Sequence, residues 1–283
     1  MVSMDEVKKG LRDIEENYTR YLISHFREWK KWAEQSDTIY EGREVKEEEV
    51  PPVFLTEMRI MKVIKEMETL GEFDWNNQTL RLLFSELSSG PFYTYFGGII
   101  AHITIELAKL CKASHLVEVG AGDGRLTEIL LARMKERNVQ IPLLLTDSKP
   151  VVEVASTKVR EKYPAMEIES MIWDIMKPPS TEMLTRISHP SIIYERYSLT
   201  YTNYQAIANL AQVGDVLVMG GWFNNTGAIY GYDKVFAKLG FKSLLLEEIE
   251  KKLKEHYPCI YALDRAVKEA IDFPNTTLLL AWR

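Results

Sequence analysis

Three glycines at alternate positions are the residues of this sequence best suited to holding a ligand. Gly120, Gly122 and Gly124 follow an apolar run that begins at Leu116, and a helical pattern follows them. Without Cβ atoms, such a loop can adopt positive φ angles and bring its backbone very close to a nucleoside. Ala121 lies inside this loop. The N–H groups at the start of the following helix are expected to face the ligand.

The spacing of the glycines argues against a dinucleotide. A loop that binds a nicotinamide or flavin cofactor uses G-x-G-x-x-G/A, and counting from Gly120 places Arg125 where the third small residue should stand. An NAD-dependent oxidoreductase is therefore the least favoured function. A plain strand-to-helix turn remains open, because a glycine triplet alone is weak support for a ligand site.

Acidic residues accompany the glycine loop and the next two apolar runs. Glu118 stands two residues before Gly120, Asp147 closes the next run, and Asp174 follows the one after it. A carboxylate can accept hydrogen bonds from two neighbouring hydroxyl groups at once. Asp147 could instead cap a helix, and Asp174 could be a turn residue.

These acids and glycines resemble the motifs of the class I S-adenosylmethionine-dependent methyltransferases, over roughly residues 92–283. The resemblance implies S-adenosylmethionine as cofactor, with Glu118 anchoring the loop or the methionyl ammonium and Asp147 holding the ribose. Asp174, with Trp173 or Ile175, would bind the adenine. The complete implied set of cofactor-binding residues is Glu118, Gly120, Ala121, Gly122, Gly124, Asp147, Ser148, Trp173, Asp174 and Ile175.

The elements that must position these residues alternate between strand and helix after residue 114. This alternation of strands and helices predicts an α/β fold with a doubly wound, seven-stranded, mostly parallel sheet. The resemblance implies the strand order 3-2-1-4-5-7-6, closed by an antiparallel hairpin. The predicted strands are 116–120, 143–147, 167–173, 191–197, 215–220, 242–248 and 276–282. The predicted helices between them are 124–136, 150–162, 203–211 and 229–239.

The first hundred residues show the helical period instead. Apolar residues recur every three or four positions, and a proline-containing acidic segment at 41–52 predicts a linker. The predicted helices are 11–33, 53–70, 78–87 and 97–111. We therefore expect two domains, a helical N-terminal cap over 1–90 and a Rossmann-like methyltransferase domain over 91–283. The cap would be a lid over the active site, or else cover the sheet or mediate a homodimer.

The segment after the fourth strand should meet both cofactor and acceptor, because ligands bind beyond the carboxyl ends of strands in such sheets. Here it is rich in tyrosine and lacks the signatures of nucleobase, glutamine and arginine methylases. Glu195 is the candidate general base and Tyr197 a second catalytic candidate, although Glu195 could simply pair with Arg196. The candidate acceptor-binding residues, each of which could instead pack in the core, are Tyr93, Tyr95, Tyr201, Trp222 and Asn224.

The expected function is methyl transfer to nitrogen or oxygen of a small molecule by in-line displacement. The sulfonium is already a good leaving group, so alignment of the partners can carry much of the rate. Two alternatives remain open: a catalytically silent cofactor-binding scaffold or regulator, and an aminopropyl-type transferase on the same fold. An aminopropyl-type transferase uses a pair of acids around its amine substrate, and no clear second aspartate stands near Glu195.

Bulk composition limits the partners. The formal net charge is −6, so a domain-wide basic field is lacking and nucleic acid is an unlikely partner. The chain has two cysteines, Cys111 and Cys259, which we interpret as reduced thiols of a cytoplasmic protein. A targeting segment, a membrane span and a metal-ligand pattern are not expected.

Overall fold

The computed structural model describes residues 77–89, 91–148, 151–196, 204–222, 236–245 and 276–282, together with scattered residues between 56 and 74. Within these residues, seven strands form one sheet in the order β3-β2-β1-β4-β5-β7-β6. The strands are β1 (His115–Val119), β2 (Leu143–Asp147), β3 (Ile168–Ile172), β4 (Ser191–Arg196), β5 (Val216–Trp222), β6 (Lys242–Leu245) and β7 (Thr276–Trp282). The predicted fold class and strand order are confirmed.

The central strands run parallel and end at the same edge of the sheet. β1 pairs in parallel with β2 on one side and β4 on the other, and β3 and β5 extend this arrangement. β7 lies antiparallel between β5 and β6, as the predicted closing hairpin requires. The carboxyl ends of β1, β2 and β4 are therefore brought together, and the predicted ligand residues follow two of them.

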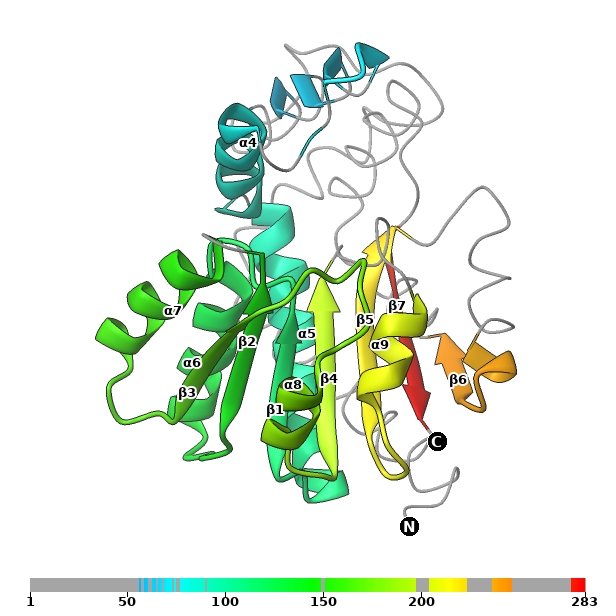
Figure 1. Cartoon of the computed structure of the whole chain (residues 1–283). Helices are drawn as coiled ribbons and strands as arrows, with labels where there is room; N and C mark the ends of the chain where they lie inside the picture. The colour runs from blue at the N-terminus through cyan, green and yellow to red at the C-terminus, as the bar shows by residue number, and fades with distance from the viewer. Residues whose placement is uncertain are drawn as a thin grey trace, which may run out of the picture. The chain divides into compact units, whose positions relative to one another are not determined.

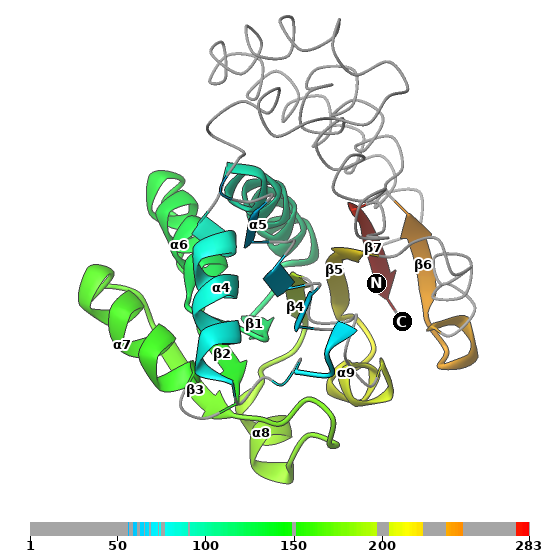
Figure 2. The ribbon, with the colours of Figure 1, turned by 90° about the horizontal axis from the view of Figure 1, so that it is seen from above.

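Helices cover both faces of the sheet (Figures 1 and 2). One face carries α5 (Pro91–Cys111), α6 (Arg125–Glu136) and α7 (Val151–Lys162), and the opposite face carries α8 (Thr181–Arg186) and α9 (Tyr204–Leu210). Long crossovers of this kind are what parallel strands need. A further helix, α4 (Gln78–Ser89), precedes α5 in the chain.

Two helices differ from the sequence prediction. α5 begins at Pro91 rather than at residue 97, which fits the preference of proline for the first turn of a helix. α8 was not predicted, because six residues are too few to show a helical period. Its start is nevertheless encoded locally, since the Ser180 hydroxyl accepts a hydrogen bond from the Met183 N–H at 3.1 Å. Of the predicted helix 229–239, the structure describes residues 236–239, and 236–238 of these are helical.

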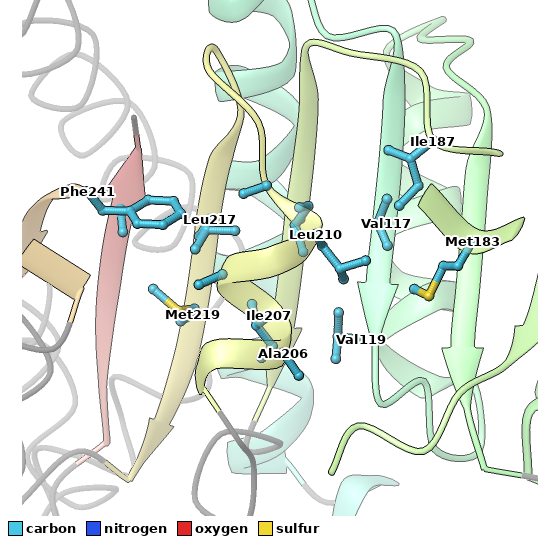
Figure 3. Close-up of a cluster of buried hydrophobic side chains, with 14 of the residues drawn as sticks. Val117, Val119, Met183, Ile187, Ala206, Ile207, Leu210, Leu217, Met219 and Phe241 are labelled. Carbon is cyan, nitrogen blue, oxygen red and sulfur yellow. The ribbon is translucent and has the colours of Figure 1, made fainter. Parts of the chain in front are cut away.

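A buried apolar layer joins the sheet to α8 and α9 (Figure 3). Alternate residues of β1, Val117 and Val119, point into it, as do Leu217 and Met219 of β5. Because side chains alternate along a strand, Leu116 and Glu118 belong to the other face of β1. This alternation decides on which face each functional side chain lies.

The chain divides into two compact units. One unit contains Gly97–Glu247 and Thr276–Arg283, together with Met1–Glu16, and the other contains Asn17–Phe96 and Glu248–Asn275. The predicted domains 1–90 and 91–283 stay a prediction, because most of 1–90 lies outside the described residues. In the described part of the chain, none of the helices combines the length and the apolar character that crossing a membrane would take.

Candidate functional site

The glycine loop leaves the carboxyl end of β1 and enters α6. Gly120, Gly122 and Gly124 all have positive φ angles, of 69°, 57° and 79°. L-residues with side chains rarely adopt these angles, so the three glycines are needed for the backbone path itself. The predicted strand-loop-helix arrangement is confirmed.

The backbone N–H groups of the loop are used inside the protein, and the expectation that those at the start of α6 face the ligand stays a prediction. Gly120 and Ala121 both donate to the carbonyl of Thr146 on β2, at 2.9 and 3.0 Å. Gly124 donates to the Ala121 carbonyl at 2.9 Å, and Gly122 donates to the Asp147 carboxylate at 2.8 Å. The loop is thus fastened to β2 by hydrogen bonds of its own N–H groups.

The second and third glycines serve different purposes. A Cβ atom added at Gly122 would have no heavy atom of the described residues within 4 Å, so these residues leave open space over Gly122. A Cβ at Gly124 would lie 3.4 Å from Ala155 and Val159 of α7. A Cβ at Gly124 would thus make ordinary contact with α7, and the φ angle of 79° is what favours glycine there, while Gly122 borders a space that a ligand could occupy.

Asp147 lies beside this open space at the end of β2. One carboxylate oxygen accepts the Gly122 N–H, and the other accepts the Ser148 N–H at 2.6 Å and the Ser148 hydroxyl at 3.2 Å. Burial raises the pKa of this carboxyl, and these hydrogen bonds partly offset that rise. The structure brings Asp147 and Ser148 to the loop, where Asp147 holds Gly122 in place, and cofactor binding by both residues stays a prediction.

Glu118 is almost completely buried, with 1% of its surface exposed, one strand position before the loop. Its Oε2 atom accepts hydrogen bonds from the Tyr194 hydroxyl on β4 at 2.7 Å and from the Thr127 hydroxyl on α6 at 2.8 Å. Burial raises the pKa of this carboxyl from 4.5 to about 7, although both donors and the positive charge of Arg196 oppose the rise. Glu118 thus ties β1 to β4 and α6.

We expect Glu118 to make the stability of the protein depend on pH. Its folded-state pKa lies above its unfolded value, so its stabilising contribution is complete below pH 4.5 and is lost as the pH rises to about 7. Over that range the free energy of unfolding should fall by about 3 kcal/mol from this group. In urea unfolding at several pH values, Glu118→Gln should lack this component. A difference between parent and variant that is constant with pH would contradict the assignment.

The residues predicted to bind adenine follow β3. Asp174 is exposed and occupies a turn, where it accepts the Met176 N–H at 3.1 Å and pairs with Lys177 at 3.1 Å. The Lys177 ammonium lowers the pKa of this carboxyl. Trp173 belongs to the buried apolar layer and its indole N–H donates to the Lys177 carbonyl at 3.0 Å, whereas Ile175 is partly buried against that layer. Asp174 is thus a turn residue, and adenine binding by Asp174, Trp173 or Ile175 stays a prediction.

Solved structures share this architecture. The CMeT domain of the citrinin polyketide synthase matches with a TM-score of 0.57 and 13% identity over 82% of this chain, and the carbon methyltransferase CurJ matches with 0.54 and 17% over 81%. The fold is that of the Rossmann-like methyltransferases. The DszA carbon methyltransferase matches with a TM-score of 0.51 and 14% identity over 81% of this chain. This chain spans 66% of the length of each of the three structures.

Sequence comparison adds no closer relative. No protein-family model matches this chain, and no curated protein matches it. At 13–17% identity, the solved structures establish the methyltransferase fold, and the chemistry must be argued from the site itself.

In this methyltransferase fold, the candidate base Glu195 lies on the opposite face of β4 from Tyr194. Its neighbours on the flanking strands are Val119 and Met219, and only 1% of its surface is exposed. Glu195 therefore stands at the carboxyl end of the sheet, within the layer that α8 and α9 cover. Its role as a base stays a prediction.

The side chains of the five acceptor candidates are not among those that the structure describes. Tyr201 and Asn224, like the catalytic candidate Tyr197, lie outside the described residues. The backbone of Tyr93 and Tyr95 belongs to the first turns of α5, and that of Trp222 ends β5, but their side chains are not among those described. In the described part of the chain, no group of three or more His, Cys, Asp or Glu side chains is arranged to hold a metal ion.

Tyr194 and Thr127 are the site residues that sequence reasoning missed. Both touch Glu118, which the sequence did single out. A usable signal existed, because Glu118 and Tyr194 each follow a pair of apolar residues within a predicted strand. Parallel pairing places them side by side as Cα partners.

Proposed function

We propose that this chain is an S-adenosylmethionine-dependent methyltransferase that acts on nitrogen or oxygen of a small-molecule acceptor. The observation that carries the proposal is the open space over Gly122, bordered by the Asp147 carboxylate at the end of β2. A glycine with a positive φ angle beside an acid in that position fits a nucleoside whose ribose hydroxyls reach the carboxylate. The methyltransferase fold makes this chemistry the natural first candidate.

The residues of the described site fit the three parts of the cofactor. Asp147 and Ser148 would hold the ribose, and Glu118 would face the ammonium of the methionyl end. Asp174 would accept from the adenine amino group, and two exposed apolar side chains near it, Ile172 (54% exposed) and Met176 (58% exposed), offer surface for the ring. A partly apolar site with a few placed polar groups is typical of nucleoside pockets.

The bound cofactor would supply a methyl group on a positively charged sulfur, a good leaving group. The chain's own task is then to bind, align and exclude water, and a base is needed only for an acceptor that binds protonated. Glu195 is our candidate for that base, with Tyr197 beside it in the sequence. Tyr93, Tyr95, Tyr201, Trp222 and Asn224 are proposed to line the acceptor site.

The proposed setting is the cytoplasm, with a small molecule rather than nucleic acid as acceptor. The low cysteine content favours a reducing compartment, and the net charge of −6 disfavours a polyanion. A homodimer through the N-terminal helices remains part of the proposal.

Transfer of labelled methyl groups tests the acceptor class. The purified protein is incubated with S-adenosylmethionine carrying a tritiated methyl group and a cell extract, followed by ultrafiltration. We expect label in the small-molecule fraction with the parent and strongly reduced label with Asp147→Ala. Label in the macromolecular fraction alone would contradict a small-molecule acceptor. Mass spectrometry of the labelled product then separates nitrogen and oxygen from carbon as the methylated atom.

A further inference from the structure

Tyr194 is one of the largest completely buried side chains of the described residues, with 0% of its surface exposed. It lies on β4, directly beside Glu118 of β1 as its parallel Cα partner. A tyrosine hydroxyl in the interior needs a hydrogen-bond partner, and here that partner is the acid that precedes the glycine loop. The mechanism proposed above assigns Tyr194 no role.

Both hydroxyl donors bind the same carboxylate oxygen of Glu118. The Tyr194 hydroxyl lies 2.7 Å and the Thr127 hydroxyl 2.8 Å from Oε2. Oε1 accepts no hydrogen bond from the residues that the structure describes, although Glu118 is only 1% exposed. Oε1 is not one of the fully buried oxygens that lack a partner, so it keeps slight solvent contact, and a donor that arrives with a ligand can reach it.

We propose that Tyr194 is a positioning residue that binds Oε2 of Glu118, with Thr127, and so presents Oε1 to the ammonium group of the cofactor's methionyl end. This inference rests on the proposed function. The hydroxyls of Tyr194 on β4 and Thr127 on α6 both bind Oε2, and together they fix the rotamer of the Glu118 carboxylate. Oε1 is therefore held in one orientation. A hydroxyl donor also stabilises the ionised carboxylate, which is the form that attracts an ammonium.

The charged groups around Glu118 act in opposite directions. Arg196 on β4 favours the ionised carboxylate, and Asp147 at the end of β2 disfavours it. Burial is the largest influence and raises the pKa of Glu118 to about 7, while the Tyr194 hydroxyl lowers it. Removing that hydroxyl should therefore raise the pKa of Glu118 further. Binding of an ammonium ligand should then require a higher pH.

Tyr194→Phe tests the inference, because it removes only the hydroxyl. The dissociation constant of S-adenosylhomocysteine is measured by calorimetry between pH 6 and 9. Parent affinity should rise with pH through the titration of Glu118. The variant should bind about tenfold more weakly near pH 7.5, with the rise displaced to higher pH. Thr127→Val removes the other donor to Oε2 and provides a second test. It should also weaken S-adenosylhomocysteine binding and displace the rise in affinity to higher pH.

Two controls separate positioning from general damage. Adenosine lacks the amino-acid end, so its affinity should be the same for the parent and for Tyr194→Phe. Tyr163→Phe removes a hydroxyl that donates to the Glu128 carbonyl at 3.3 Å on α6, and it should leave both ligands unaffected.

The outcomes are distinct. If the parent binds S-adenosylhomocysteine and the pH profiles of parent and Tyr194→Phe coincide, the positioning role is overturned while the proposed function stands. If Tyr194→Phe loses affinity equally for adenosine and S-adenosylhomocysteine, the positioning role is likewise overturned. If the parent binds neither ligand at any pH, the proposed function fails and this inference falls with it.

Discussion

Gly122→Val should weaken binding of S-adenosylhomocysteine by about 100-fold or more. Its backbone φ of 57° is strained for any β-branched residue, which costs roughly 1–3 kcal/mol. The added side chain would also point into the open space over the loop, where the nucleoside is proposed to lie. Because nothing in the described protein stands within 4 Å of that position, the variant should still fold while its ligand site is filled.

A matched control exists in the same unit. Gly240 also has a positive φ angle, 84°, and a Cβ atom added there would meet open space, but this glycine lies in the turn before β6. Gly240→Val should therefore carry a similar strain and lose similar stability while binding the ligand like the parent. If the two variants bind equally well, the space over Gly122 is not the nucleoside site.

Asp147→Ala should weaken cofactor binding by about 1.5 to 3 kcal/mol, or roughly 10- to 150-fold. The substitution removes the proposed acceptor for the ribose hydroxyls and also the acceptor for the Gly122 and Ser148 N–H groups. Asp147→Asn keeps one oxygen acceptor and should show a smaller loss. Calorimetry with S-adenosylhomocysteine measures both variants.

Glu169→Ala is the control for the loss of one acid. Glu169 lies on β3 and its carboxylate is half exposed in an ion pair with Arg186 at 3.4 Å. Its removal should leave ligand affinity within about twofold of the parent, because surface ion pairs contribute little. Unchanged binding in folded Asp147→Ala would place the ribose elsewhere.

The sheet could be predicted from sequence because its signals are local. Most strands are short runs with apolar residues at the majority of positions, and the predicted bounds of β2 and β7 agree with the structure to the residue. The strand order came from the resemblance carried by Glu118, the glycines and the later acids. The start of α5 was missed because the aromatic residues after Pro91 carry no clear period, although proline itself favours a helix start.

The finer parts of the site depend on contacts that sequence spacing does not show. The N–H groups of the glycine loop turn to β2 because Thr146 and Asp147 lie beside them across the sheet. Trp173 lies in the apolar layer beneath α8, a helix that the sequence did not reveal, and its contact with adenine stays a prediction. Tyr194 meets Glu118 only through the pairing of β1 with β4.

Binding of the cofactor tests the central claim most directly. The parent protein is titrated by calorimetry with S-adenosylmethionine, S-adenosylhomocysteine and, separately, NAD. We predict a dissociation constant on the order of micromolar for the first two, equivalent to roughly −8 kcal/mol, and no binding of NAD. Failure of both sulfur ligands to bind at about 1 mM, with NAD binding instead, would contradict the account.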